Sequence, residues 1–243
     1  MTEVAVPREA AEAQGRFPAV FRRTPPTGIL PKAHGAGPPA YGWGVTMRVA
    51  GILLAAGEGS RLGQPKALVQ LAGETFAERG VALLRDGGTD PVLLVTGAVP
   101  VTIPTAVAVH NPDWATGMGS SLATGLRALE DSDVGAAVIA LADQPLVGAR
   151  AVRRLIDAYR DGAAVVVAGY AGQPRNPVLI SREHWPAVIE LATGDTGARE
   201  FLRARPELVT LVECGDTGSC DDVDTPEDLA RIRTVASVRS EKP

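Results

Sequence analysis

Short apolar runs alternate with helix-like segments along most of the chain, beginning near Met47. The helix-like segments lie at 75–85, 120–129 and 149–160, and the runs of strand length lie at 49–54, 91–96, 106–109, 136–141 and 163–168. Each run is continuously apolar, which is typical of strands covered by helices on both faces. The pattern predicts an α/β fold with a doubly wound, mostly parallel sheet in three α/β/α layers.

The pattern is less regular after residue 170. Two further strands are predicted at 176–180 and 208–212, and a closing helix at 226–233. No internal repeat is present. We therefore expect residues 47–243 to form a single domain.

Residues 1–46 differ from the rest of the chain. They are rich in proline and glycine and show neither helical nor strand periodicity. They also lack the basic start and apolar centre of a secretory signal. We expect the folded protein to begin near Met47, with residues 1–46 either a disordered tail or an upstream stretch added by a misassigned start.

Composition narrows the classes of function. Of the 243 residues, 45% are apolar and 21% are charged, and the net charge is −4. This balance gives no general attraction to nucleic acid or anionic membranes, and no apolar run approaches the roughly 20 residues of a membrane span. Cys214 and Cys220 are too few for a disulfide framework and lack the spacing of a zinc site. We expect free thiols in a cytoplasmic protein, with pairing across a tight loop as the alternative.

The loop after the first strand-like run carries the first candidate chemistry. Glycines at 57, 59 and 63 allow backbone amides to approach an anion, and Arg61 and Lys66 add positive charge. The glycine spacing does not match a dinucleotide fingerprint, and Pro-Lys-Ala stands where a Walker A loop has Gly-Lys-Ser/Thr. Phosphate binding is the favoured interpretation, and a glycine-rich connector with two solvated cations is the alternative.

The same loop resembles the signature of GT-A-like nucleotidyltransferases, and most of all the molybdenum cofactor cytidylyltransferases. The matching residues are Leu-Ala-Ala-Gly at 54–57 and Ser-Arg-Leu-Gly-Gln-Pro-Lys at 60–66. The resemblance implies a Rossmann-like GT-A fold in which Arg61 and Lys66 neutralise the triphosphate as pyrophosphate leaves. It also implies that the nucleotide contacts Leu54, Ala55, Ala56, Gly57, Gly59, Ser60, Arg61 and Lys66.

A second loop of small residues follows the third strand-like run. From the residues alone, Ser120 is expected to cap the next helix. The resemblance implies that this loop faces the nucleobase, with Ser121 reading its edge and Gly117 and Met118 forming the pocket wall. It places Thr96 and Gly97 on the other side of the same pocket.

Two aspartates are candidate metal ligands. Asp143 follows the run 136–141 directly, and Mg²⁺ takes one or two carboxylates together with substrate phosphates. Capping of the next helix is the alternative for Asp143. The resemblance implies Asp143, in Asp-x-Pro, and Asp224, in Asp-Thr-Pro-Glu-Asp, as the two ligands, with Asp222 as the fallback for the second. Thr225 and Pro226 read as the entry to the closing helix.

The acceptor side is less defined. The resemblance implies that residues 172–180 and 194–199 face the acceptor, and Arg175, Asn176 and Arg199 are the candidate contacts. Asn176 stands where relatives commonly have histidine, and solvated surface arginines are the alternative interpretation.

These residues predict an enzyme in which Lys66, Arg61 and Asp143 are catalytic. The expected reaction is Mg²⁺-dependent transfer of CMP from CTP to molybdopterin, with a molybdoenzyme or its chaperone as a candidate protein partner. Alternatives are GTP-dependent transfer, transfer to a sugar phosphate or phospholactate-type acceptor, and a non-catalytic nucleotide-binding chaperone. A dehydrogenase is disfavoured, because Thr96-Gly97 stands where an acidic ribose ligand is needed.

Overall fold

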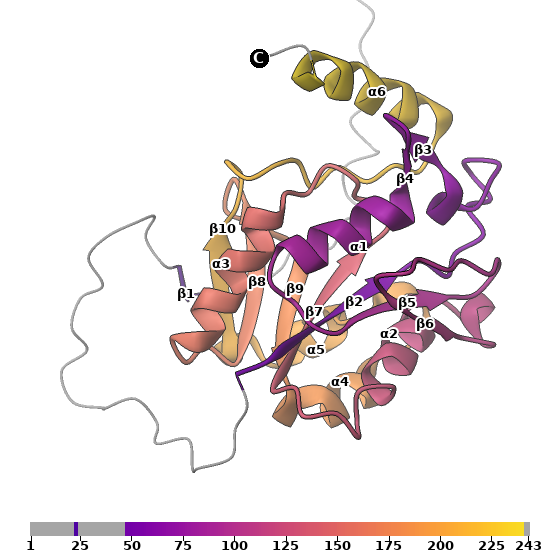
Figure 1. Cartoon of the computed structure of the whole chain (residues 1–243). Helices are drawn as coiled ribbons and strands as arrows, with labels where there is room; N and C mark the ends of the chain where they lie inside the picture. Colours follow the sequence, from indigo (N-terminus) through magenta and orange to yellow (C-terminus); the bar gives the residue numbers. More distant parts are fainter. Residues whose placement is uncertain (1–21, 24–46, 241–243) are drawn as a thin grey trace, which may run out of the picture.

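The computed structural model describes residues 22–23 and 47–240, which form one mixed sheet with helices on both faces (Figure 1). The strand order is β1-β10-β8-β9-β7-β2-β5-β6. The strands are β1 (Arg22–Arg23), β2 (Val49–Leu54), β5 (Val92–Thr96), β6 (Val107–His110), β7 (Ala136–Leu141), β8 (Val165–Tyr170), β9 (Gln173–Ser181) and β10 (Val209–Glu213). A separate hairpin pairs β3 (Gln70–Leu71) with β4 (Glu74–Thr75).

All pairs in the main sheet are parallel except those of β9, which runs antiparallel to β7 and β8. The prediction of a doubly wound, mostly parallel sheet is therefore confirmed. Its continuous apolar runs are explained by burial on both faces: every residue of β2 and β5 is buried.

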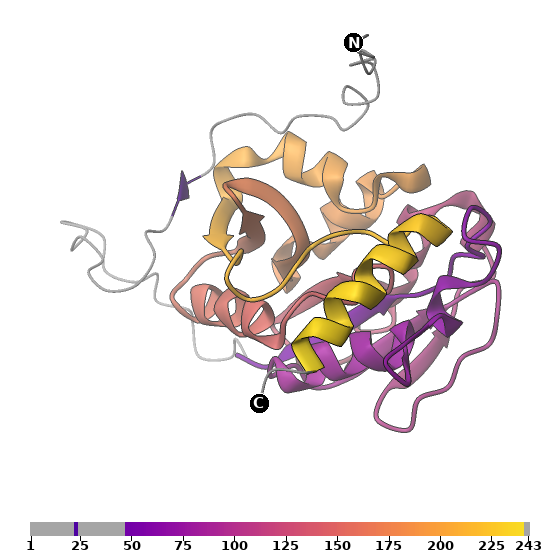
Figure 2. The same cartoon turned by 90° about the horizontal axis from the view of Figure 1, so that it is seen from above.

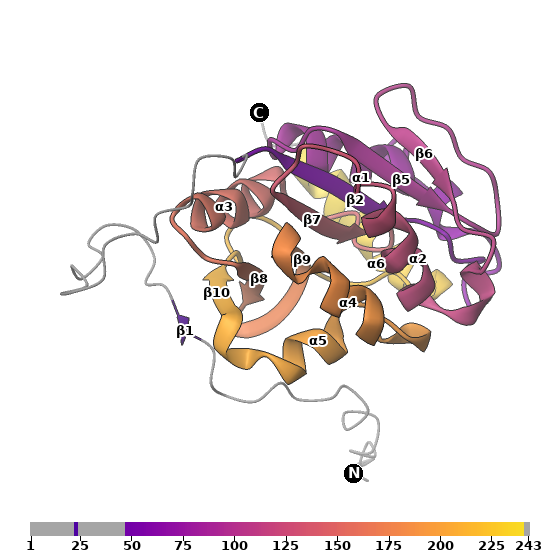
Figure 3. The ribbon, with the colours of Figure 1, turned by 90° about the horizontal axis from the view of Figure 1, so that it is seen from below.

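Two helical layers enclose the sheet (Figures 1 and 3). One face packs against α1 (Phe76–Asp86) and α3 (Ala149–Arg160), and the other against α2 (Met118–Arg127), α4 (Trp185–Leu191) and α5 (Arg199–Ala204). The last helix, α6 (Pro226–Ser240), crosses one end of the sheet beside the β3–β4 hairpin (Figure 2). None of the described helices is long and apolar enough to cross a bilayer.

Several elements differ from the prediction. The hairpin and helices α4 and α5 were not predicted, and α6 continues to Ser240 rather than ending at 233. Arg22–Arg23 pairs with β10 inside the segment for which no strand was predicted. The other residues of 1–46 lie outside the described part, so the predicted tail stays a prediction.

Candidate active site

The carboxyl ends of β2 and β7 lie side by side, with Leu54 paired to Leu141. From β2 the chain continues to β5 and β6 on one side, and β7 then returns to the other side of β2. The loops after β2 and β7 therefore diverge at a topological switch point, where open α/β sheets bind ligands. Both the predicted phosphate loop and Asp143 begin at this point.

The loop after β2 depends on glycine at one position above all. Gly59 has φ +68°, and a Cβ there would lie 2.0 Å from the carbonyl oxygen of Gln64. The Gly59 carbonyl accepts hydrogen bonds from the amides of Leu62 and Gly63. A side chain at Gly59 would therefore break the turn that leads from Ala55 and Ala56 to Lys66.

Four charged side chains from three loops meet at the switch point. Lys66 Nζ donates to Asp143 Oδ2 at 2.9 Å and also to Asp224 Oδ1. The guanidinium of Arg61 lies 3.2 Å from Asp224 Oδ1. The structure thus brings together Arg61, Lys66, Asp143 and Asp224, which the sequence analysis had selected separately. Asp143 does not cap α3, because Gly148 occupies that cap position.

The cluster is partly removed from water. The Lys66 side chain is 20% exposed and that of Asp143 is 21% exposed. Burial acts to lower the pKa of Lys66, but the two carboxylates outweigh it and hold that pKa above its usual range. Asp143 Oδ1 is buried and accepts no hydrogen bond from the described residues. A buried carboxylate oxygen without a partner is costly, and a cation or a donor on a substrate would satisfy it.

A small apolar cluster lies beneath these charges. Each charged loop contributes one side chain close to its charged residue: Leu62 beside Arg61, Leu146 after Asp143, and Val223 beside Asp224. The remaining members are Val69, Leu71, Phe76, Leu229 and Ile232. Because all are buried together, packing fixes the positions of the three loops relative to one another.

Backbone bonds join the second and third loops directly. The amide of Val223 donates to the Asp143 carbonyl at 2.9 Å, and Thr225 caps α6 by accepting from the amide of Asp228 at 3.2 Å. The expected helix entry at Thr225-Pro226 is confirmed. Asp224 is thereby placed directly opposite Asp143.

Asp222 has a different environment from Asp224. Its Oδ1 accepts a 2.8 Å hydrogen bond from the side-chain Nε2 of Gln144, which also donates to the Cys220 carbonyl at 3.2 Å. Burial first, and then the charge of Asp143, raise the pKa of Asp222. Sequence reasoning missed the role of Gln144, which links the Asp143 loop to residues 220–222.

On the other side of the switch point, Gly97 after β5 lies in close contact with neighbouring segments. A Cβ at Gly97 would lie 2.4 Å from Cβ of Trp114 and 2.8 Å from Cβ of Ala56. The carbonyl of Thr96 accepts from the amide of Asn111 at 2.8 Å. Glycine at position 97 thus allows the three segments that follow β2, β5 and β6 to meet.

Asn111 organises the loop that was predicted to face the nucleobase. Its side chain is buried and donates to Ser120 Oγ at 2.9 Å and to Ser121 Oγ at 3.0 Å. The cap prediction for Ser120 is wrong, because Gly117 holds the cap position and Ser120 donates to its carbonyl. The only sequence signal for Asn111 is its place at the end of a strand, in Asn-Pro-Asp.

The start of α2 is packed against residues 192–197. A Cβ at Gly117 would lie 2.4 Å from the Gly194 carbonyl carbon, and the amide of Met118 lies 3.4 Å from Asp195 Oδ1. The predicted base-facing turn and the predicted acceptor-facing loop are therefore in direct contact.

The three candidate acceptor residues are not gathered in the same way. The Arg175 guanidinium donates to the carbonyl of its neighbour Pro174 at 3.0 Å, and Arg199 is exposed at the start of α5. Asn176 lies where the register of β9 shifts, since Ala168 pairs with Arg175 whereas Val167 pairs with Val178. The structure places Arg175 and Asn176 on one strand and Arg199 on a separate helix.

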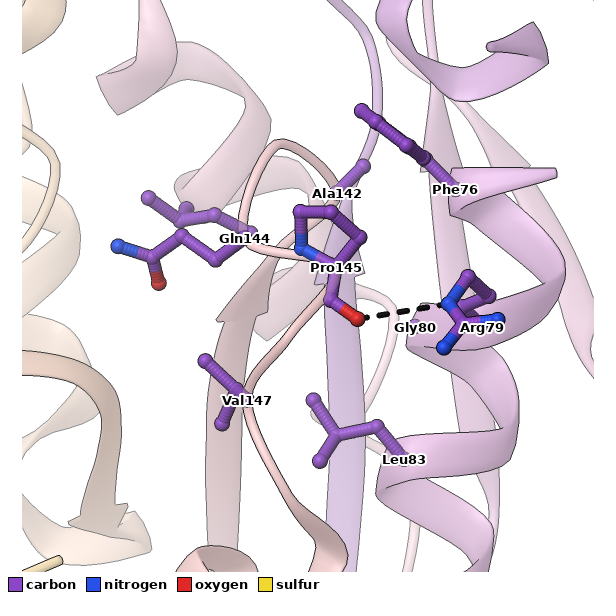
Figure 4. A pocket seen from close by; sticks show the side chains of 9 residues that line it. Phe76, Arg79, Gly80, Leu83, Ala142, Gln144, Pro145 and Val147 are labelled. Atoms are coloured by element: carbon purple, nitrogen blue, oxygen red, sulfur yellow. Dashed lines mark hydrogen bonds between the residues drawn. The ribbon is translucent and has the colours of Figure 1, made fainter. Parts of the chain in front are cut away.

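A small pocket lies behind the Asp143 loop, against α1 (Figure 4). Arg79 reaches across it to the Pro145 carbonyl at 3.4 Å, and its guanidinium also binds Glu74 at 2.9 Å. Arg79 thus links the β3–β4 hairpin to the Asp143 loop, which sequence reasoning did not predict. The lining of this pocket includes none of the predicted site residues.

Comparison with known proteins identifies the family of the chain. Residues 51–209 match the MobA-like NTP transferase domain. The chain belongs to this family. The match covers the first loop, the Asn111–Ser121 loop and Asp143, so the nucleotidyltransferase resemblance seen in the sequence is confirmed.

Curated relatives cover the same region. Nicotine blue oxidoreductase of Paenarthrobacter nicotinovorans is 38% identical over 199 residues, covering 76% of this chain and 96% of that protein. Purine catabolism protein PucB of Bacillus subtilis (strain 168) is 29% identical over 201 residues, covering 77% and 97%. The names of these two relatives point to different chemistry, so membership of the family does not specify the substrate.

Solved structures share the fold. The crystal structure of a homologue of Mycobacterium tuberculosis Rv0371c, from Mycobacterium sp. strain JC1, has a TM-score of 0.70 at 31% identity and covers 80% of this chain and 99% of its own. Rv0371c in complex with manganese has a TM-score of 0.64 at 25% identity, covering 77% and 98%.

The residues present suit a divalent cation that is also bound by substrate. Among residues 22–23 and 47–240, no group of three or more His, Cys, Asp and Glu side chains forms a metal site by itself. Asp143 and Asp224 supply two carboxylates, one with an unpartnered buried oxygen. Two carboxylates completed by phosphate oxygens are a usual Mg²⁺ environment.

Proposed function

We propose that this protein transfers CMP from CTP to molybdopterin and releases pyrophosphate, in a Mg²⁺-dependent reaction. The observation that carries the proposal is the convergence of Lys66, Arg61, Asp143 and Asp224 at the switch point of the sheet. Family membership supports the nucleotidyl transfer. The choice of cytidine and of molybdopterin rests on the resemblance of the first loop, Leu-Ala-Ala-Gly, to the cytidylyltransferases.

The roles follow from charge and position. Asp143 and Asp224 would hold the cation, which supplies positive charge to phosphate oxygens when bound. Arg61 and Lys66 would stabilise the charge that develops on the departing pyrophosphate, and amides of the Gly57–Gly63 loop would hold its oxygens. No residue needs to act as a nucleophile, because an acceptor phosphate oxygen can attack the α-phosphorus directly.

The base is proposed to bind between Thr96-Gly97 and the Gly117-Met118 turn. Ser121 is buried and accepts from Asn111, so its hydroxyl hydrogen remains available for a cytosine edge. Arg175, Asn176 and Arg199 are proposed to contact the phosphorylated acceptor. Free thiols at Cys214 and Cys220 agree with a reaction in the cytoplasm.

The test is a screen of the four ribonucleoside triphosphates with Mg²⁺ and molybdopterin, scored by pyrophosphate release. We expect turnover with CTP above that with GTP, and its loss in Lys66→Ala. Ser121→Ala should lower the CTP-to-GTP ratio of kcat/KM by about tenfold, which corresponds to one lost hydrogen bond. Preference for GTP would contradict the cytidine assignment, and turnover only with a sugar phosphate would contradict the acceptor.

A second candidate is a redox reaction, favoured by the 38% identity with nicotine blue oxidoreductase. It is tested by following oxidation of NADH and NADPH in the presence of the dye nicotine blue. Dye reduction that survives Asp143→Asn, without pyrophosphate release from any triphosphate, would replace the transferase proposal.

A further inference from the structure

We propose that Lys66 is a built-in counter-cation that closes the candidate metal site until the nucleotide arrives. In this arrangement a divalent cation binds poorly to the nucleotide-free protein. Lys66 leaves Asp143 and Asp224 only when a cation–triphosphate complex supplies both a new cation for the carboxylates and new anions for the ammonium. The inference rests on the proposed nucleotide site and concerns how that site is loaded.

The geometry places one ammonium where the cation is expected. Lys66 Nζ contacts Asp143 Oδ2 at 2.9 Å and Asp224 Oδ1. Asp143 and Asp224 come from loops 77 and 158 residues further along the chain. A cation held by the same two carboxylates would lie within a few ångströms of Nζ, and the repulsion of like charges is strong at this separation. The ammonium and a divalent cation therefore compete for the same carboxylates.

The balance of charge explains why Lys66 does not leave the two carboxylates by itself. Asp143 and Asp224 both contact Lys66, and Asp224 also contacts Arg61. Withdrawal of Lys66 alone would leave the partly buried Asp143 without its cation and Asp224 with only the exposed Arg61, which is costly. The Lys66 side chain is itself only 20% exposed, and its ammonium needs an anion wherever it moves.

A cation–triphosphate complex meets both needs in one step. It brings positive charge to the carboxylates and phosphate oxygens to Lys66, so every charged group keeps a partner. A free cation brings only positive charge for the carboxylates. A free triphosphate brings only phosphate oxygens for Lys66, and its negative charge is repelled by the carboxylates. Lys66 can make this exchange because a lysine ammonium is a point charge on a flexible four-carbon stem.

The experiment measures cation binding without any turnover. Mn²⁺ is titrated into the nucleotide-free full chain, and free Mn²⁺ is measured by electron paramagnetic resonance. We expect Lys66→Met, which keeps the length of the stem and removes the charge, to bind Mn²⁺ about tenfold or more tightly than wild type, because a competing like charge is gone. Lys66→Arg should stay close to wild type, since it keeps the charge.

Arg61→Gln is the matched control. It also removes one positive charge near Asp224. Arg61, however, contacts Asp224 and not Asp143, and the Arg61 side chain is 72% exposed. We expect a smaller gain in Mn²⁺ affinity than in Lys66→Met. Equal gains in the two variants would show a general electrostatic effect and overturn the proposal, as would Mn²⁺ affinity in Lys66→Met equal to or below that of wild type.

A second measurement keeps the proposal testable if Lys66→Met does not fold. In wild type, CTP should raise Mn²⁺ affinity, and Mn²⁺ should raise CTP affinity by the same factor. Absence of this coupling would overturn the proposal. The titrations contain no acceptor and no pyrophosphate assay. A protein that failed the transferase screen could therefore still show the exchange, and an active transferase could fail to show it.

Discussion

The proposed nucleotide-facing edge of the sheet and the proposed acceptor-facing half hold their charged side chains very differently. At the first, Lys66 is ion-paired to carboxylates from two other loops before any substrate is present. At the second, Arg175 donates to its own neighbour and Arg199 is exposed on a short helix. A charge that the fold already positions is suited to the step common to a family. Charges held loosely leave room for the acceptor to vary.

The difference has a structural cause. The loops after β2 and β7 leave adjacent parallel strands, and the segment between β10 and α6 joins them in the apolar cluster that contains Leu62, Leu146 and Val223. The acceptor candidates lie on two different elements, β9, where the register shifts, and α5, and neither Arg175 nor Arg199 is ion-paired to a carboxylate of the site at the switch point in the described part of the chain. We therefore expect changes at the first region to affect chemistry and stability together, and changes of the candidate acceptor contacts in the second to affect only the acceptor.

The largest effect is expected from Asp143→Asn. An amide has no negative charge to hold a cation against a triphosphate, so kcat/KM should fall by about 100-fold or more, since even outer partners of a metal ligand cost 10–100-fold. Thermal unfolding should remain cooperative. Asp157→Asn, at an exposed site on α3, is the control and should leave the rate unchanged. Near-normal turnover of Asp143→Asn in excess Mg²⁺ would remove this residue from the mechanism.

The same assay separates the two candidates for the second ligand. Asp224 contacts Lys66 and Arg61, whereas Asp222 is held by Gln144. Asp224→Asn should therefore be as damaging as Asp143→Asn, and Asp222→Asn should be milder. The reverse order would move the second ligand to Asp222.

A pair of leucines tests whether the apolar cluster positions the site. Leu146 and Leu202 are both buried, the first beneath the charged loops and the second on α5. Replacement of either by alanine should lower the free energy of unfolding by about 2–5 kcal/mol. Only Leu146→Ala should also weaken CTP binding, measured by calorimetry at a temperature where both variants are folded. Equal nucleotide affinity in the two variants would show that the cluster contributes stability alone.

The elements of the fold also differ in how well the sequence could predict them. Strands β2 and β7 were predicted at their observed bounds, because six consecutive buried residues in β2 and five in β7 leave a clear apolar run. The two-residue strands β3 and β4, and helices α4 and α5 of seven and six residues, are too short to show a period. Their positions depend on packing against the rest of the molecule rather than on local pattern.

The candidate site divides in a similar way. Lys66, Asp143 and Asp224 lie in motifs that resemble a family, and their contact in space agrees with that resemblance. Asn111 and Gln144 act through hydrogen bonds to residues elsewhere in the chain. No local pattern distinguishes such a residue from an ordinary buried amide, so it could be found only from the structure.

A smaller effect is expected on the acceptor side. Arg175→Ala and Arg199→Ala should each raise the KM for the acceptor by about tenfold, because each variant would lose one contact to the acceptor phosphate. This is the scale of one charge-assisted hydrogen bond. The KM for CTP should stay unchanged in both. A larger change in the KM for CTP than in that for the acceptor would show that the two regions are not independent, and the contact between Gly117 and Gly194 would be the first place to look.

The smallest expected effect uses two thiols of the segment between β10 and α6. Cys214 is fully buried after β10, where burial raises its pKa to about 11, while Cys220 is partly exposed beside the Asp222 loop. Burial also raises the pKa of Cys220, so at pH 8 both are mainly protonated and access decides the rate. Iodoacetamide, followed by mass spectrometry, should label Cys220 at least about tenfold faster than Cys214. Labelling of both should quicken as the pH rises from 8 toward 10, since the thiolate fraction of each cysteine increases with pH.

CTP with Mn²⁺ should slow labelling of Cys220 alone, because the Cys220 carbonyl is bound by the Gln144 side chain at the edge of the candidate site. Equal protection of Cys214 would mean that nucleotide binding tightens the acceptor half as well, and the contrast between the two regions would then hold only for the substrate-free protein.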